Sequence, residues 1–166
     1  MTPELRDLYQ EVILDHNRRP RHFHVLQDAS HRADGYNPLC GDRLTVYVQV
    51  EDGRVREASF QGSGCAISKA SASMMTDAVS GKSLDDARSL FEAFHRMVTS
   101  ASDAPADPAE LGKLAVFAGV REFPARVKCA SLAWHTLLAA LRADSGTVST
   151  EGADEPAVAR GAGGHR

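Results

Sequence analysis

Residues 43–60 constrain the fold of this chain more strongly than any other stretch. Polar and apolar side chains alternate over 43–50, which is the period of a strand with one face buried. Glu51-Asp52-Gly53-Arg54 is a turn sequence typical of a hairpin, and the residues after it predict a returning strand. A further strand is expected around 31–36. The centre of the chain therefore predicts a small antiparallel sheet.

Helical patterns flank this hairpin on both sides. Thr2-Pro3-Glu4 has the cap, the proline and the acid of a helix start, and Pro20 ends the apolar pattern that follows. Later segments also predict helices, and they cover 65–79, 84–97, 110–117 and 125–142. The expected fold class is α+β, a small antiparallel three-stranded sheet packed by helices on one face.

Length and composition predict one domain followed by a tail. The 166 residues suit a single domain over 1–144. Glycine, alanine and glutamate dominate after Asp144, so we expect residues 145–166 to be a disordered tail.

Charge and hydropathy exclude several classes of protein. A net charge of −3 and a pI near 6.1 argue against a nucleic-acid binder. No apolar stretch approaches the roughly 18 residues of a membrane span, and the N-terminus lacks a secretory signal pattern. We therefore expect a cytoplasmic protein with reduced thiols and with no nucleic-acid or membrane partner.

The cysteines number three, an odd count that cannot complete a disulfide framework. Each lies beside a turn: Cys40 ahead of the best strand, Cys65 after the hairpin, and Cys129 near the start of the last helix. In a reducing compartment such cysteines indicate metal ligands or sulfur chemistry.

A hairpin brings its two ends together, so Cys40 and Cys65 are expected to lie close in space. A helix that opens at Cys65 favours thiolate over thiol, and a helix packed behind can deliver Cys129. With Asp42, three thiolates make a tetrahedral donor set that zinc accepts, and thiolates also suit iron–sulfur clusters. The alternative is that Cys65 and Cys129 are small buried hydrophobic residues, which explains Cys40 less well because a polar Gly-Asp turn follows it.

Several longer segments resemble a known family. They are Ile13-Leu14-Asp15-His16 with Pro20-Arg21, Asn37-Pro38-Leu39-Cys40-Gly41-Asp42, Gly64-Cys65-Ala66-Ile67-Ser68, Ala70-Ser71-Ala72-Ser73-Met74-Met75, and Arg126-Val127-Lys128-Cys129-Ala130-Ser131-Leu132-Ala133-Trp134. In order and content these segments, spread over residues 4–142, resemble the U-type iron–sulfur cluster assembly proteins, the family of the IscU and NifU scaffolds. The resemblance implies a SufE/NifU-like architecture.

Two features are similar to the SufU branch of that family. Scaffold-type members carry a histidine directly before the third cysteine, where this chain has Lys128, and the interval from Cys65 to Cys129 is longer here. The resemblance implies a zinc ion held by Cys40, Asp42, Cys65 and Cys129.

The resemblance also implies a SufS-type cysteine desulfurase as partner. In the mechanism that the resemblance implies, the desulfurase would offer a histidine to the zinc. Cys40 would then leave the metal and accept persulfide sulfur for a downstream iron–sulfur scaffold. Arg126 lies three residues before Cys129, so we expect it to support this chemistry by balancing the charge of the site or by contacting the partner. Two alternatives stay open: a scaffold on which an iron–sulfur cluster is transiently bound, and an interaction module with structural zinc.

The histidines and the remaining basic residues give weaker signals. His22 and His24 lie in a basic loop without a nearby thiol, so we do not expect a second metal site there. His95 and His135 fall on predicted helices and are expected at the surface or half-buried. Lys69 follows Cys65 by one turn and is either a solvated side chain or a group that favours the thiolate.

Overall fold

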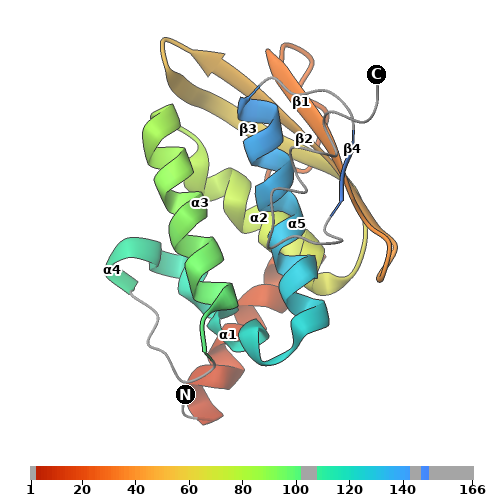
Figure 1. The fold of residues 1–166 in the computed structure, drawn as a ribbon, viewed down its shortest axis with the longest axis vertical. Coiled ribbons are helices and arrows are strands. Elements are labelled where there is room, and N and C mark those ends of the chain that lie inside the picture. The colour runs from red at the N-terminus through yellow and green to blue at the C-terminus, as the bar shows by residue number, and fades with distance from the viewer. Residues whose placement is uncertain (1–2, 102–107, 143–146, 150–166) are drawn as a thin grey trace.

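The computed structural model describes residues 3–101, 108–142 and 147–149, which form a sheet with helices packed against it (Figure 1). The elements in chain order are α1 (Pro3–Arg18), β1 (His31–Asn37), β2 (Asp42–Glu51), β3 (Arg54–Ser63), α2 (Ala66–Val79), α3 (Leu84–Thr99), α4 (Pro108–Leu111), the 3-10 helix η1 (Gly112–Glu122), α5 (Pro124–Leu141) and β4 (Thr147–Ser149). None of the helices in these ranges is long and apolar enough to cross a membrane.

The sheet has the strand order β3-β2-β1-β4. Strand β2 is antiparallel to both of its neighbours, with Val46 opposite Phe60 on β3 and opposite Ala33 on β1. This confirms the predicted three-stranded antiparallel sheet and the α+β class. The short strand β4 adds to the edge by pairing parallel with β1.

Strand β4 falls inside the segment that was expected to be a disordered tail. Residues 147–149 differ from that expectation because they pair with Asp34, Gly35 and Tyr36 of β1. The remainder of 145–166 lies outside the described residues.

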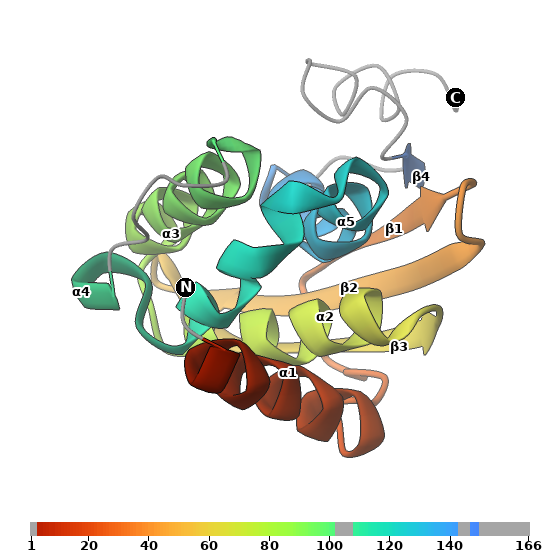
Figure 2. The ribbon, with the colours of Figure 1, turned by 90° about the horizontal axis from the view of Figure 1, so that it is seen from below.

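One face of the sheet packs against α2 and α5, with the other helices around them (Figure 2). The alternating side chains of Leu44, Val46 and Val48 are buried on β2, as the period-2 pattern predicts. On α5, Trp134 is fully buried and stacks on Phe94 of α3 with ring centroids 4.7 Å apart. Burial of this apolar surface is the main force that holds the helices on the sheet.

Two helical segments differ from their sequence-based descriptions. The predicted helix over 110–117 is mostly the 3-10 helix η1, preceded by the single turn of α4.

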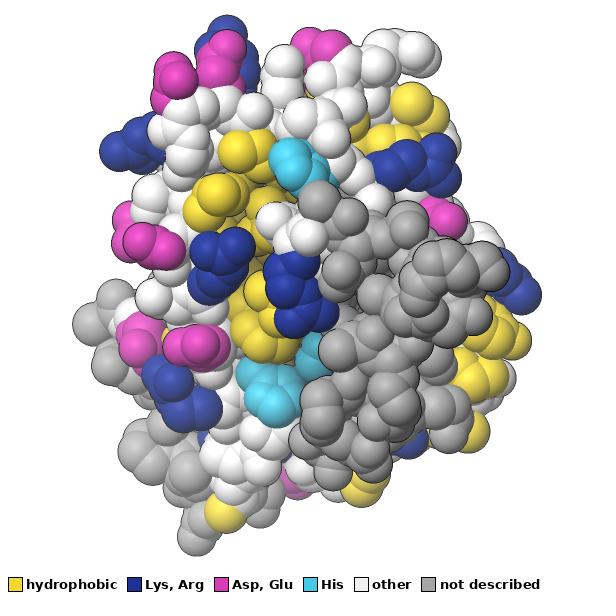
Figure 3. Space-filling view, turned by 45° about the horizontal axis from the view of Figure 1, so that its top comes forward, with side chains coloured by type: hydrophobic (Ala, Val, Ile, Leu, Met, Phe, Trp, Pro, Cys, Tyr) yellow, Lys and Arg dark blue, Asp and Glu magenta, His cyan; other side chains and the backbone are white. Residues whose placement is uncertain are grey.

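His135 is buried rather than half-exposed, with 4% of its surface accessible, because α3 packs over α5 and brings Phe91 and His95 against its ring. Histidine side chains lie among hydrophobic and basic ones on the face turned forward in Figure 3.

The C-terminal end of α1 is fixed by polar contacts. Asp15 forms ion pairs with Arg19 and Arg21, and hydrogen bonds from these guanidinium groups lower the pKa of its carboxyl to about 2. The His16 ring lies 2.7 Å from the Ser73 hydroxyl, measured from Nδ1 to Oγ, and the Arg21 backbone N–H donates to the same oxygen. These contacts give the Asp15-His16 and Pro20-Arg21 motifs a structural role.

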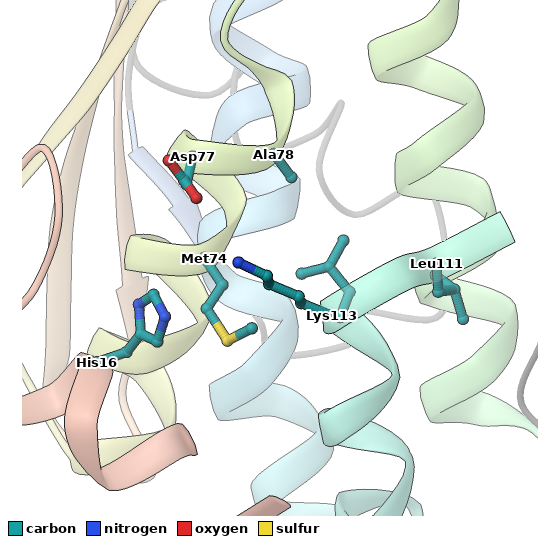
Figure 4. Close-up of a pocket in the computed structure, with 7 residues that line it drawn as sticks. His16, Met74, Asp77, Ala78, Leu111 and Lys113 are labelled. Carbon is teal, nitrogen blue, oxygen red and sulfur yellow. The ribbon is translucent and has the colours of Figure 1, made fainter. Parts of the chain in front are cut away.

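A hollow of about 210 Å³ lies beside this contact. Its lining residues come from α1, α2, α4 and η1 (Figure 4), and they are His16, Met74, Asp77, Ala78, Leu111, Lys113 and Leu114. The predicted site residues do not line it.

Candidate metal centre

The turn between β1 and β2 positions Cys40 and Asp42. Strand β1 ends at Asn37, which pairs with Asp42 at the start of β2, and Gly41 N–H donates to Asn37 C=O to close the turn. Gly41 has a φ of +72°, a conformation that glycine adopts without steric cost. The result is an exposed Cys40 two residues from a fully buried Asp42.

The connection from β3 to α2 positions Cys65 on the other side of Asp42. Cys65 is the N-cap of α2, and its Sγ accepts a hydrogen bond from Ser68 N–H at 3.4 Å. Its own backbone N–H donates to Asp42 Oδ1 at 2.8 Å, and its Sγ lies 3.9 Å from Asp42 Oδ2. The absence of a side chain at Gly64 permits this approach, since a Cβ there would lie 2.5 Å from Asp42 Oδ1.

Helix α5 delivers the third cysteine from behind the sheet. Cys129 is buried in its second turn, and its Sγ lies 3.1 Å from Cys40 Sγ. The ligand atoms of Cys40, Asp42 and Cys129 all lie within 4.8 Å of one another, so these residues form a group that can hold a metal ion. Cys65 is not a member of this group, but its Sγ lies 3.9 Å from Oδ2 of Asp42, which is one.

The thiols are coupled through their hydrogen bonds. A hydrogen bond from Cys129, together with the backbone N–H groups of Ser68 and Ile67, lowers the pKa of Cys65 to about 7. The pKa of Cys129 is raised by its hydrogen bond to Cys65, by burial and by its hydrogen bond to Cys40. In the metal-free protein the hydrogen bond from Cys129 and the N-terminus of α2 therefore both favour the thiolate form of Cys65.

This donor set fits zinc. Three sulfur atoms and one carboxylate oxygen are accepted ligands of a tetrahedral site, in which zinc–sulfur bonds of about 2.3 Å place two sulfurs roughly 4 Å apart. The Cys40 and Cys129 sulfurs, 3.1 Å apart, reach that spacing with a small outward movement. The exposed position of Cys40 leaves the site accessible from solvent.

The side chains of Arg126 and Lys69 both lie against aromatic rings. The Arg126 guanidinium lies over the ring of Phe123, 4.7 Å from its centroid, and the side chain is exposed. The Lys69 ammonium lies 5.6 Å from the ring centroid of Phe23. The contact that the structure describes for the Arg126 side chain is thus with an aromatic ring, and its expected supporting role stays a prediction.

Asn37 is the site residue to which sequence reasoning assigned no role. It is fully buried, and its Nδ2 donates to Asp42 Oδ2 at 3.3 Å and to Cys129 Sγ at 3.5 Å. The available signal was its position at the end of a strand, followed by Pro38, where an asparagine side chain commonly organises a turn.

The fold and this cysteine–aspartate cluster are those of an iron–sulfur cluster assembly protein, and comparison with known proteins agrees. The NifU-like N-terminal domain family matches residues 8–130, and the chain belongs to this family. This confirms the resemblance to the U-type proteins.

Relatives with two different named activities are similar to the chain. The iron–sulfur cluster assembly scaffold protein IscU of Streptococcus pyogenes serotype M1 is 42% identical over 139 residues, covering 84% of this chain and 86% of the relative. The zinc-dependent sulfurtransferase SufU of Bacillus subtilis is 43% identical over 133 residues, covering 80% and 88%.

A solved structure has the same fold. It is a putative iron–sulfur cluster assembly scaffold protein for the SUF system from Fervidobacterium islandicum AW-1, with a TM-score of 0.73 and 31% identity. The match covers 79% of this chain and 94% of that one. The SufU branch of the family is thus supported by both sequence and structure.

Proposed function

We propose that this chain is a zinc-dependent sulfur-transfer protein that accepts persulfide sulfur from a SufS-type cysteine desulfurase at Cys40. It then passes the sulfur to a downstream iron–sulfur scaffold. The observation that carries this proposal is the exposed thiol of Cys40, set on a turn against the buried Cys129 and Asp42. The metal ligands would be Cys40, Asp42, Cys65 and Cys129.

Accessibility separates the three cysteines. Cys40 is exposed, Cys65 is half-buried and Cys129 is 2% exposed. A persulfide carried on another protein can approach Cys40 without unfolding this chain, whereas Cys129 lies beneath it. Bound zinc would keep the thiols deprotonated at neutral pH.

The transfer step conserves atoms and electrons. The Cys40 thiolate attacks the outer sulfur of the partner's persulfide, a new S–S bond forms on Cys40, and the partner's cysteine leaves as thiolate. No external oxidant or reductant is needed. Cys40 then carries the sulfane sulfur in the persulfide form.

Exposed apolar side chains next to Cys40 and at the start of α5 suit a protein partner. Leu39, next to Cys40, is 60% exposed, and Phe123, the N-cap of the helix that carries Cys129, is 48% exposed. The Arg126 guanidinium stacks on Phe123. Exposed apolar side chains with an arginine are typical of interface contacts.

The scaffold function is the second candidate, and the identity to IscU-named relatives favours it. It uses the same ligands. Lys128 stands where scaffold-type members carry a histidine, so one ligand for a labile cluster is missing, and this ranks the scaffold below sulfur transfer. A purely structural zinc ranks third, because structural sites are closed and built from cysteine and histidine, whereas Cys40 is exposed.

The test combines metal analysis with sulfur mapping. The purified protein is analysed for zinc, iron and acid-labile sulfide, then mixed with the desulfurase and cysteine, and the persulfide is located by mass spectrometry. We expect one zinc per chain, sulfane sulfur on Cys40, and loss of desulfurase activation in Cys40→Ala but not in the exposed helix variant Ser89→Ala. Full activation by Cys40→Ala contradicts the proposal, and iron with labile sulfide supports the scaffold.

A further inference from the structure

We propose that Asn37 is a positioning residue of the metal centre, whose side-chain amide holds Asp42 and Cys129 and leaves Cys40 as the ligand that exchanges. This inference rests on the metal site of the proposed function. It explains how one of three chemically identical thiolates becomes the reactive one.

The orientation of the Asn37 amide is fixed by its neighbours. Oδ1 accepts a hydrogen bond from Leu39 N–H at 3.2 Å, while Nδ2 faces Asp42 Oδ2 and Cys129 Sγ. A flipped amide would set an oxygen against the carboxylate and an NH₂ group against the Leu39 N–H, so only one orientation satisfies all groups. The buried amide thus uses both its donor and its acceptor capacity.

Asn37 joins segments that are far apart in the sequence. It lies at the end of β1, pairs with Asp42 on β2, and donates to a sulfur on α5 that is 92 residues away. A single planar amide therefore sets the distance between the carboxylate and the thiol that both belong to the metal group. Outer contacts of this kind orient metal ligands and tune their basicity.

Hydrogen-bond donors are distributed unequally over the three sulfurs. Cys129 Sγ receives the Asn37 amide and Cys65 Sγ receives the Ser68 backbone N–H. Within the described ranges, the hydrogen-bond partner of Cys40 Sγ is another sulfur, that of Cys129. A thiolate that accepts an N–H bond carries less charge and is a weaker nucleophile, so Cys40 keeps the greatest reactivity.

Asn37→Ser tests the inference by mutation. A serine hydroxyl can still accept the Leu39 N–H in the turn but cannot serve Asp42 and Cys129 together. The matched control is Asn17→Ser, because Asn17 is the other asparagine of the chain and lies on α1, a helix that carries no cysteine. Both variants are loaded with zinc and tested by chelator competition and by limited alkylation with mass-spectrometric mapping.

In wild type and Asn17→Ser we expect Cys40 to be alkylated first and Cys129 last. In Asn37→Ser the alkylation rate of Cys129 relative to Cys40 should rise about fivefold, the equivalent of one lost hydrogen bond. Zinc affinity should fall about tenfold or more. Unchanged alkylation order and unchanged affinity in Asn37→Ser overturn the inference, as does an equal change in Asn17→Ser.

A measurement on the wild-type chain covers the case in which Asn37→Ser does not fold. Cadmium-113 replaces zinc, and scalar coupling from the metal through sulfur to hydrogen-bonded N–H protons is recorded by NMR. We expect correlations to the side-chain amide of Asn37 and to the backbone amide of Ser68. A correlation for Ser68 without one for Asn37 overturns the inference.

The two proposals fail separately. Altered cysteine reactivity in Asn37→Ser with no sulfur found on Cys40 of wild type supports the positioning role and overturns the sulfur-transfer function. Sulfur found on Cys40 of wild type, with unaltered cysteine reactivity in Asn37→Ser, supports the sulfur-transfer function and overturns the positioning role.

Discussion

The carboxylate of Asp42 accepts the backbone N–H of Cys65 at 2.8 Å, and this contact ties the start of β2 to the start of α2. The carboxylate is fully buried, and a buried anion must be hydrogen-bonded or paired to be tolerated. Cys65 and Asn37 supply the donors that the structure describes. These two donors thus satisfy the carboxylate of a residue that belongs to the group able to hold a metal ion.

Gly64→Ala should disrupt this contact. An added Cβ would lie 2.5 Å from Asp42 Oδ1, so either the carboxylate or the β3–α2 connection must move. We expect a loss of about 1–3 kcal/mol in the free energy of unfolding and at least a tenfold loss in zinc affinity. Denaturant titration and chelator competition measure the two effects. The control is Ser63→Ala, since Ser63 is the preceding residue and its side chain is exposed. This variant should leave the free energy of unfolding and the zinc affinity unchanged.

Asp42→Asn separates the charge of the carboxylate from its shape. The amide oxygen can still accept the Cys65 N–H, but the new NH₂ group then faces the Asn37 amide and the metal position. We expect zinc affinity to fall by tenfold or more while the circular dichroism spectrum stays that of wild type. Retention of wild-type affinity would show that Asp42 is not a ligand.

Local patterns predicted the elements that position the site. The alternation over Leu44–Val50 and the Glu51–Arg54 turn predicted β2 and the hairpin because both depend on neighbouring residues. The turns beside Cys40 and Cys65 predicted that both thiols would lie at one end of the sheet. These inferences need only the period of a strand and the geometry of a hairpin.

Contacts between segments that are distant in the chain could not be predicted from the sequence. The hydrogen bond from Asn37 to Cys129 depends on the rotation of α5 over the sheet, which no local pattern specifies. Strand β4 is only three residues long, and it pairs with a part of β1 that is far away in the sequence. The burial of His135 likewise depends on the placement of α3.

Ser73→Ala should loosen α1 from α2. The buried Ser73 hydroxyl contacts the His16 ring at 2.7 Å and accepts the Arg21 N–H at 2.8 Å, so its loss leaves buried polar groups without partners. We expect a decrease of about 1–3 kcal/mol in stability by thermal or denaturant unfolding. Ser68→Ala is the matched control, since this hydroxyl is also buried on α2 but lacks a hydrogen-bond partner among the described residues. Equal destabilisation by both variants would contradict the role of Ser73.

His135 should make the folded state sensitive to mild acid. Burial, with the nearby charges of His95 and Arg142, lowers the pKa of His135 from 6.5 to about 4. Below pH 6.5 His135 is protonated in the unfolded chain but stays neutral in the folded chain. The free energy of unfolding therefore decreases as the pH is lowered, until the pH reaches the pKa of the folded state. The loss from this residue is about 2 kcal/mol at pH 5 and about 3 kcal/mol near pH 4. Denaturant unfolding across this range should show a shallower pH dependence for His135→Phe, whereas the exposed-site control His24→Phe should keep the wild-type slope. A wild-type slope in His135→Phe would assign the acid sensitivity to other groups.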